Sequence, residues 1–147
     1  MKRAFSLVLV LFALILSLVS CKESRSITID ASKAVNFRCE SYIATSGKSY
    51  ELDKSLSVKL YNQCYDGKSS AEELDIKVNI TDGFIDLVFV GDTADENALI
   101  VDEKANYGAF TVYSNDIVFF KYDKVRKFYQ FEEGFYNFVK TQILIFS

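Results

Sequence analysis

The chain has 147 residues, half of them apolar, and a formal net charge of −3, which suits a single globular domain. It contains no His, which excludes Ser-His-Asp and Cys-His catalysis and the commonest imidazole metal sites. Its Lys and Arg residues are interspersed with Asp and Glu, so no nucleic-acid partner is expected.

Residues 1–20 are predicted to be a signal peptide. Lys2 and Arg3 form a basic start, and an apolar run of about 16 residues follows, from Ala4 to Val19. A run of this length is typical of the apolar core of a signal peptide and is short for a membrane-spanning helix. No second run of spanning length follows in the sequence.

The apolar run ends in Leu18-Val19-Ser20-Cys21, which resembles the lipobox of bacterial lipoproteins; the resemblance covers only the first 21 residues. It implies cleavage before Cys21, a diacylglycerol on the Cys21 thiol and an acylated new amino terminus. Residues 21–26, "CKESRS", then form a short polar tether. The resemblance places the protein on the exported side of the bacterial cell envelope, anchored to the inner or the outer membrane by lipid.

The first two predicted strands carry the remaining cysteines. In "AVNFRCESYIA" (34–44) and "LSVKLYNQCY" (56–65), apolar and polar residues alternate, and both cysteines fall on the more apolar face. Two cysteines in an exported chain indicate a disulfide. We therefore predict a hairpin of these strands with a disulfide between Cys39 and Cys64.

In the same register, the other face of this hairpin pairs Tyr42 with Tyr61 and Arg38 with Tyr65. Such pairs are ordinary cross-strand contacts that stabilise a sheet. An aromatic surface with polar neighbours is also a candidate ligand-stacking face, for example for a sugar. Both interpretations stay open at this point.

Residues 72–92 predict a second hairpin. Asp82-Gly83 is a favoured type I′ turn, and the flanking residues alternate. This register pairs Ile80 with Ile85, and it pairs Asp86 with Asn79 on the other face. It also predicts the core pairs Val78–Leu87 and Ile76–Phe89. Because residues 84–90 are apolar on both faces, this strand is expected to be central or covered.

Three more strands are predicted at "NALIVDEKA" (97–105), "YGAFTVYS" (107–114) and "DIVFFKYD" (116–123), with a tight turn at "SND" between the last two. Residues 125–147 are ambiguous, and two strands are favoured over a helix. The loop "GDTADEN" gathers Asp92, Asp95 and Glu96 without the spacing of a calcium loop, so we interpret it as a solvated acidic loop. Neither a metal site nor a cofactor is expected.

The predicted fold is all-β, with a single β-rich domain over residues 27–147 and room for one C-terminal helix. About eight short strands are typical of an antiparallel β-sandwich, and a small β-barrel is the alternative. The predicted function is a non-catalytic binding module at the envelope, contacting another envelope protein, a host molecule or a glycan. A lipocalin-like small-ligand carrier is the alternative, and a hydrolase with paired carboxylates ranks third.

Overall fold

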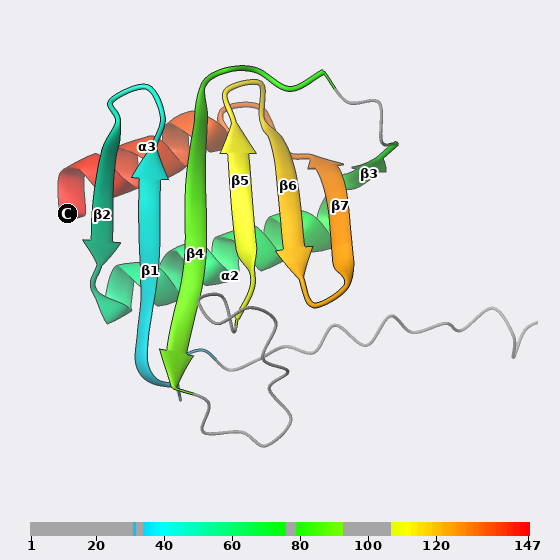
Figure 1. Ribbon diagram of the computed structural model, residues 1–147. Helices are drawn as coiled ribbons and strands as arrows, with labels where there is room; N and C mark the ends of the chain where they lie inside the picture. Colours follow the sequence, from blue (N-terminus) through cyan, green and yellow to red (C-terminus); the bar gives the residue numbers. More distant parts are fainter. Residues whose placement is uncertain (1–30, 32–33, 76–78, 93–106) are drawn as a thin grey trace, which may run out of the picture.

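The computed structural model describes residues 31, 34–75, 79–92 and 107–147, which form seven strands and two helices (Figure 1). In chain order these are β1 (Val35–Ile43), β2 (Lys48–Leu52), α2 (Lys54–Ser70), β3 (Glu72–Leu74), β4 (Phe84–Asp92), β5 (Ala109–Tyr113), β6 (Ile117–Tyr122), β7 (Val125–Gln130) and α3 (Phe135–Phe146).

The strands form one antiparallel sheet in the order β2-β1-β4-β5-β6-β7-β3. Both helices lie on the same side of this sheet (Figure 1). The molecule is therefore a mixed α/β protein with an open sheet. The predicted all-β sandwich and the alternative β-barrel are both wrong. The antiparallel sheet itself and the C-terminal helix that the prediction allowed are confirmed.

The largest correction concerns residues 56–65, predicted as a strand and found within α2. Leu56, Leu60 and Cys64 are buried four residues apart, a spacing that fits a strand and one face of a helix equally well. Ser57 and Tyr61 are also buried, which only the helical period explains. Asp53 caps the helix, since its carboxylate accepts a hydrogen bond from the Leu56 N–H at 2.8 Å.

The predicted hairpin of β1 with residues 56–65 is consequently absent. β1 pairs instead with β2 on one side, where Cys39 lies opposite Leu52, and with β4 on the other, where Cys39 lies opposite Phe89. The turn between β1 and β2 contains Gly47 in the left-handed region, with φ +65°.

The hairpin predicted around Asp82-Gly83 is also wrong in the part of the chain that the structure describes. β4 pairs with β1 and β5, so Ile85 lies opposite Ile43 and Val112 rather than Ile80. Ile80 is 48% exposed and lies outside the strands. Residues 76–78 lie outside the described residues. The central position expected for β4 is confirmed by its two strand neighbours.

The C-terminal third agrees better with the sequence pattern. β5 and β6 form the predicted hairpin around Ser114–Asp116, and β7 continues the meander. Residues 135–146 form α3 instead of a last strand, because Tyr136, Val139 and Ile143 are buried at the helical spacing of three and four. The segment 97–105 lies outside the described residues.

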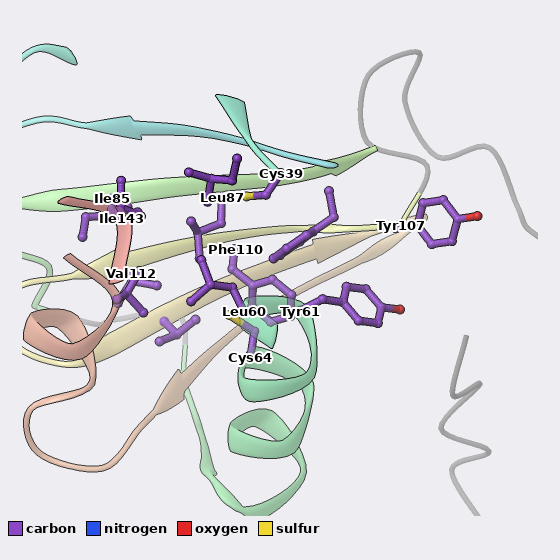
Figure 2. Close-up of a cluster of buried hydrophobic side chains, with 14 of the residues drawn as sticks. Cys39, Leu60, Tyr61, Cys64, Ile85, Leu87, Tyr107, Phe110, Val112 and Ile143 are labelled. Atoms are coloured by element: carbon purple, nitrogen blue, oxygen red, sulfur yellow. The ribbon is translucent and has the colours of Figure 1, made fainter. Parts of the chain in front are cut away.

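The core lies between the sheet and the two helices (Figure 2). Side chains from β1, β4 and β5 meet those of α2 and α3, and the largest fully buried ones include Phe37, Phe89, Phe110, Leu60, Leu87 and Ile143. Strand alternation sends every second side chain to this inner face. The other set points to the opposite face, called here the outer face.

Candidate functional site: the outer face of the sheet

The outer face carries every second residue of β1, β2, β4, β5 and β6, those that alternate along each strand with the residues pointing into the core. None of the described helices covers this face, because both pack on the inner side (Figure 1). A shallow hollow of about 570 Å³ extends from the edge strand β2 across β1 and β4 to β5 and β6. Its lining comprises Glu40, Ser41, Tyr42, Ser49, Tyr50, Glu51, Asp86, Val88, Ala109 and Lys121. Half-exposed aromatic, aliphatic and charged groups thus share one surface.

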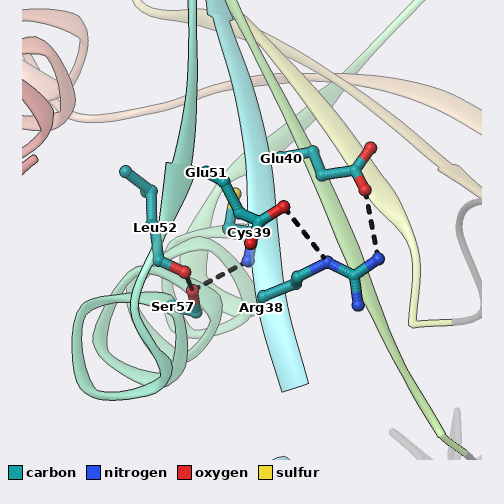
Figure 3. A network of polar contacts seen from close by, with 6 residues as sticks. All are labelled: Arg38, Cys39, Glu40, Glu51, Leu52 and Ser57. Carbon is teal, nitrogen blue, oxygen red and sulfur yellow. Dashed lines mark hydrogen bonds and ion pairs between the residues drawn. The ribbon is translucent and has the colours of Figure 1, made fainter. Parts of the chain in front are cut away.

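Arg38 organises one side of the hollow (Figure 3). Its Nη2 lies 3.3 Å from Glu40 Oε1 on the same strand, and its Nε lies 3.7 Å from Glu51 Oε2 on β2. The Glu51 side chain is 72% exposed, so these ion pairs add little to stability. What they do is hold two carboxylates and a guanidinium side by side at the surface.

Asp86 forms the opposite side of the hollow. Its Oδ1 accepts a hydrogen bond from Thr111 Oγ1 at 2.6 Å, and in the strand register it lies opposite Tyr42 and Thr111. The predicted Asp86–Asn79 pair is therefore wrong. Burial raises the pKa of Tyr113, and the charge of nearby Asp86 adds to the rise.

A row of aromatic rings adjoins the hollow at the Asp86 side. The Phe84 ring centroid lies 6.2 Å from that of Tyr42 and 6.2 Å from that of Tyr113, with tilted ring planes in both pairs. Tyr42 is 38% exposed. The row offers an apolar surface beside the carboxylates.

The stacking face predicted from the sequence is not formed as such. Arg38 and Tyr42 do lie on the outer face, but Tyr61 and Tyr65 belong to α2 on the inner side. There the two rings lie 4.5 Å apart, and the Tyr65 hydroxyl donates to the Tyr107 carbonyl oxygen at 2.9 Å. The reason is the helix, which removes residues 56–65 from the sheet and turns their tyrosines into the core.

Cys39 and Cys64 are both free thiols and both buried, so the structure contains no disulfide between them. They belong to the same core cluster, one from β1 and the other from α2 (Figure 2). Burial raises the pKa of both thiols, and for Cys39 the proximity of Cys64 adds to the rise. Such thiols are protonated and unreactive at neutral pH.

The other predicted site residues lie at the edge of the described chain or beyond it. Cys21, Asp95 and Glu96 are outside the described residues, whereas Asp92 ends β4 and accepts a hydrogen bond from Asn36 Nδ2 at 2.6 Å. Within the described ranges, no three acidic or cysteine side chains gather as a metal site would require. Neither α2 nor α3 is long and apolar enough to cross a membrane.

Sequence reasoning missed most of this surface, including Glu40, Glu51, Phe84 and Tyr113. The sequence did hold one indication of this surface, the alternation within residues 84–90. Its second face places Asp86 among apolar residues. It indicated a central strand but not which strands would lie beside it. Comparison of the chain with protein-family models, with curated proteins and with solved structures finds no match.

Proposed function

We propose that this chain is a lipid-anchored protein of the bacterial cell envelope, held by Cys21, and that it acts as a non-catalytic binding module. Its binding surface is the outer face around the hollow. The observation that supports this is the exposed combination of charged and aromatic groups on a sheet face that no described helix covers. Tyr42 and Arg38 on this face are of the residue types that are enriched in protein interfaces.

The partner class follows from the same groups. Three carboxylates, those of Glu40, Glu51 and Asp86, line the hollow with Lys121, next to the ring of Tyr42. Carboxylates accept hydrogen bonds from hydroxyl groups, and rings offer a flat apolar surface, so a glycan suits the hollow. An envelope or host protein with a complementary polar surface suits it as well.

The small-ligand carrier is no longer favoured, because a lipocalin-like carrier needs a closed barrel and this sheet is open. A second candidate is favoured by one observation: carboxylates from three different strands converge on one hollow. Glycoside hydrolysis needs such a pair. Glu51→Gln and Asp86→Asn variants, assayed on envelope glycans against the parent, separate the two candidates. Hydrolysis that each variant abolishes supports the enzyme, whereas binding without turnover supports the module.

A photo-cross-linking residue at Ser49 tests the binding surface in intact cells, and the same residue at Asn137 on α3 is the matched control. Both positions are exposed, but only Ser49 lines the hollow. We expect Ser49 to cross-link to a discrete partner that mass spectrometry identifies. Equal products from both positions would argue against a specific outer-face partner.

The anchor is tested separately. Cys21→Ala should release the protein from the membrane fraction or leave it with residues 1–20 uncleaved. The intact mass of the native protein should correspond to a chain that starts at Cys21 and carries acyl groups. A mass that matches the unmodified full sequence would defeat the anchor.

A further inference from the structure

The last turn of α3 exposes three consecutive large apolar side chains. Leu144, Ile145 and Phe146 are 52%, 64% and 59% exposed. The helix buries Tyr136, Val139 and Ile143 against the sheet, so the remaining residues of the last turn face outward. The other exposed large apolar residues of the described chain are isolated in sequence, whereas these three are consecutive.

One lysine, Lys59, lies beside this apolar turn. Lys59 Nζ lies 5.9 Å from the centre of the Phe146 ring and donates to Gln142 Oε1 at 2.6 Å. Lys140 is the only charged residue within α3. A hollow of about 220 Å³ beside Phe146 contains one acid, Asp53, whose carboxylate caps α2. Lys140 Nζ lies 6.0 Å from the centre of the Tyr136 ring, so Lys59 is the lysine beside Phe146, and an apolar group next to a basic one suits a surface of anionic lipids.

The start of α2 links the apolar turn to the residues that precede β1. The start of α2 contacts both regions: Lys54 Nζ donates to the Ala34 carbonyl oxygen at 3.1 Å, and Ser55 lines the hollow beside Phe146. Nine residues lie between Cys21 and Ala31, and the ten residue steps allow a reach of at most about 35 Å. A lipid on Cys21 therefore keeps the apolar turn within reach of the bilayer surface.

We propose that Leu144, Ile145 and Phe146 insert into the interfacial region of the membrane to which Cys21 is anchored. This contact orients the domain. It rests on the proposed lipid anchor, and it leaves the outer face free, because α3 lies on the opposite side of the sheet (Figure 1). The binding surface then lies on the side of the sheet that is opposite the membrane contact of α3.

The size of the apolar turn favours a membrane over a protein partner. Three half-exposed side chains present roughly 300 Å² of apolar surface, whereas a stable protein interface needs about 800 Å² from each partner. A contact this small is marginal between free molecules. With the acyl anchor in place it becomes intramolecular, and the high effective concentration makes it sufficient.

The chain contains no Trp, so a single introduced tryptophan reports its own surroundings. Two separate variants of the full chain, Phe146→Trp and Ile145→Trp, are produced in a bacterium that processes lipoproteins. The matched control is Val125→Trp, which is 40% exposed at the turn between β6 and β7. Each purified protein is reconstituted into phosphatidylethanolamine–phosphatidylglycerol vesicles with brominated acyl chains.

On reconstitution, we expect the emission of Phe146→Trp and Ile145→Trp to shift to shorter wavelength and to be quenched by the bromines. The emission of Val125→Trp should neither shift nor be quenched. Absence of quenching in all three, or equal quenching in all three, would overturn the proposal. A blue shift that grows with protein concentration, without quenching, would assign the apolar turn to a second copy of the chain and would equally overturn it.

Intact mass of the same preparations keeps the two proposals apart. If Cys21 carries no lipid, the anchor fails, and vesicles added to that protein test the apolar turn on its own. Quenching of Phe146→Trp would then still support the contact; without quenching, the contact, which needs the acyl anchor, is rejected together with the anchor. If Cys21 is acylated but no quenching occurs, the anchor stands and the membrane contact of α3 is rejected.

Discussion

The carboxylate of Asp116, in the turn between β5 and β6, caps helix α3 by accepting a hydrogen bond from the Tyr136 N–H at 2.8 Å. Its second oxygen accepts from the Gly134 N–H, also at 2.8 Å. The residue at the helix start, Gly134, has no side chain to do this. A cap from 20 residues away therefore ties α3 to the β5–β6 hairpin.

Asp116→Gly should destabilise the protein by about 1–2 kcal/mol, the usual worth of a helix cap. Glycine tolerates the backbone of Asp116, where φ is +61°, so the loss reports the cap and not strain. Asp123→Gly is the control, since its φ is +50° but its carboxylate caps no helix. Urea unfolding of both variants measures the difference; equal stabilities would refute the capping role.

Ser57→Ala should cost about 1–3 kcal/mol, the penalty for leaving buried backbone groups unpaired. The fully buried Ser57 hydroxyl accepts from the Cys39 N–H at 2.7 Å and donates to the Leu52 carbonyl oxygen at 3.1 Å (Figure 3). It thereby joins α2 to β1 and β2. Ser55→Ala, at an exposed position, should stay within about 0.5 kcal/mol of the parent.

The two core thiols provide a third test. Cys39 and Cys64 should not react with a thiol reagent in the native protein, because both are fully buried and their pKa values are raised. In denaturant without a reductant, both should react. The Cys39–Cys64 disulfide predicted from the sequence requires the opposite result, with no reactive thiol under the same conditions.

The stability should fall in alkali because of Tyr61. Burial is the main cause that raises its pKa from 10.0 to about 12; a hydrogen bond to Tyr65 lowers the pKa, and the nearby Tyr122 and Tyr107 raise it by smaller amounts. Above pH 10 the unfolded state releases this proton while the folded state keeps it. The stability contributed by the neutral phenol is thus complete below pH 10 and is lost as the pH rises toward 12.

Tyr61→Phe keeps the ring that contacts Phe37 at 5.5 Å and removes the ionising hydroxyl. The decline in unfolding free energy between pH 10 and 12 should be shallower in Tyr61→Phe than in the parent. Denaturant titrations at half-unit pH steps measure this slope. Identical slopes in the two proteins would contradict the assignment to Tyr61.

The local pattern of the sequence determined several elements of the fold. The sequence pattern predicted β1, β5 and β6, and the turn residues Ser114–Asp116 predicted the β5–β6 hairpin. The two strands favoured for residues 125–147 were right for β7 and wrong for α3. The correct predictions were possible because a two-residue period and a tight turn depend on neighbours in the chain. The predicted signal peptide and lipid anchor depend on local sequence in the same way. They stay predictions, which the Cys21→Ala variant and the intact mass of the native protein test.

Only the tertiary structure decided between strand and helix for residues 56–65, and it decided which strands lie beside β4. A four-residue spacing of Leu56, Leu60 and Cys64 satisfies both periods, so the choice depended on what those side chains pack against. The outer face has the same origin. Strand pairing makes Arg38 a neighbour of Glu51 and makes Asp86 a neighbour of Thr111, and pairing partners distant in sequence leave no periodic trace in either strand.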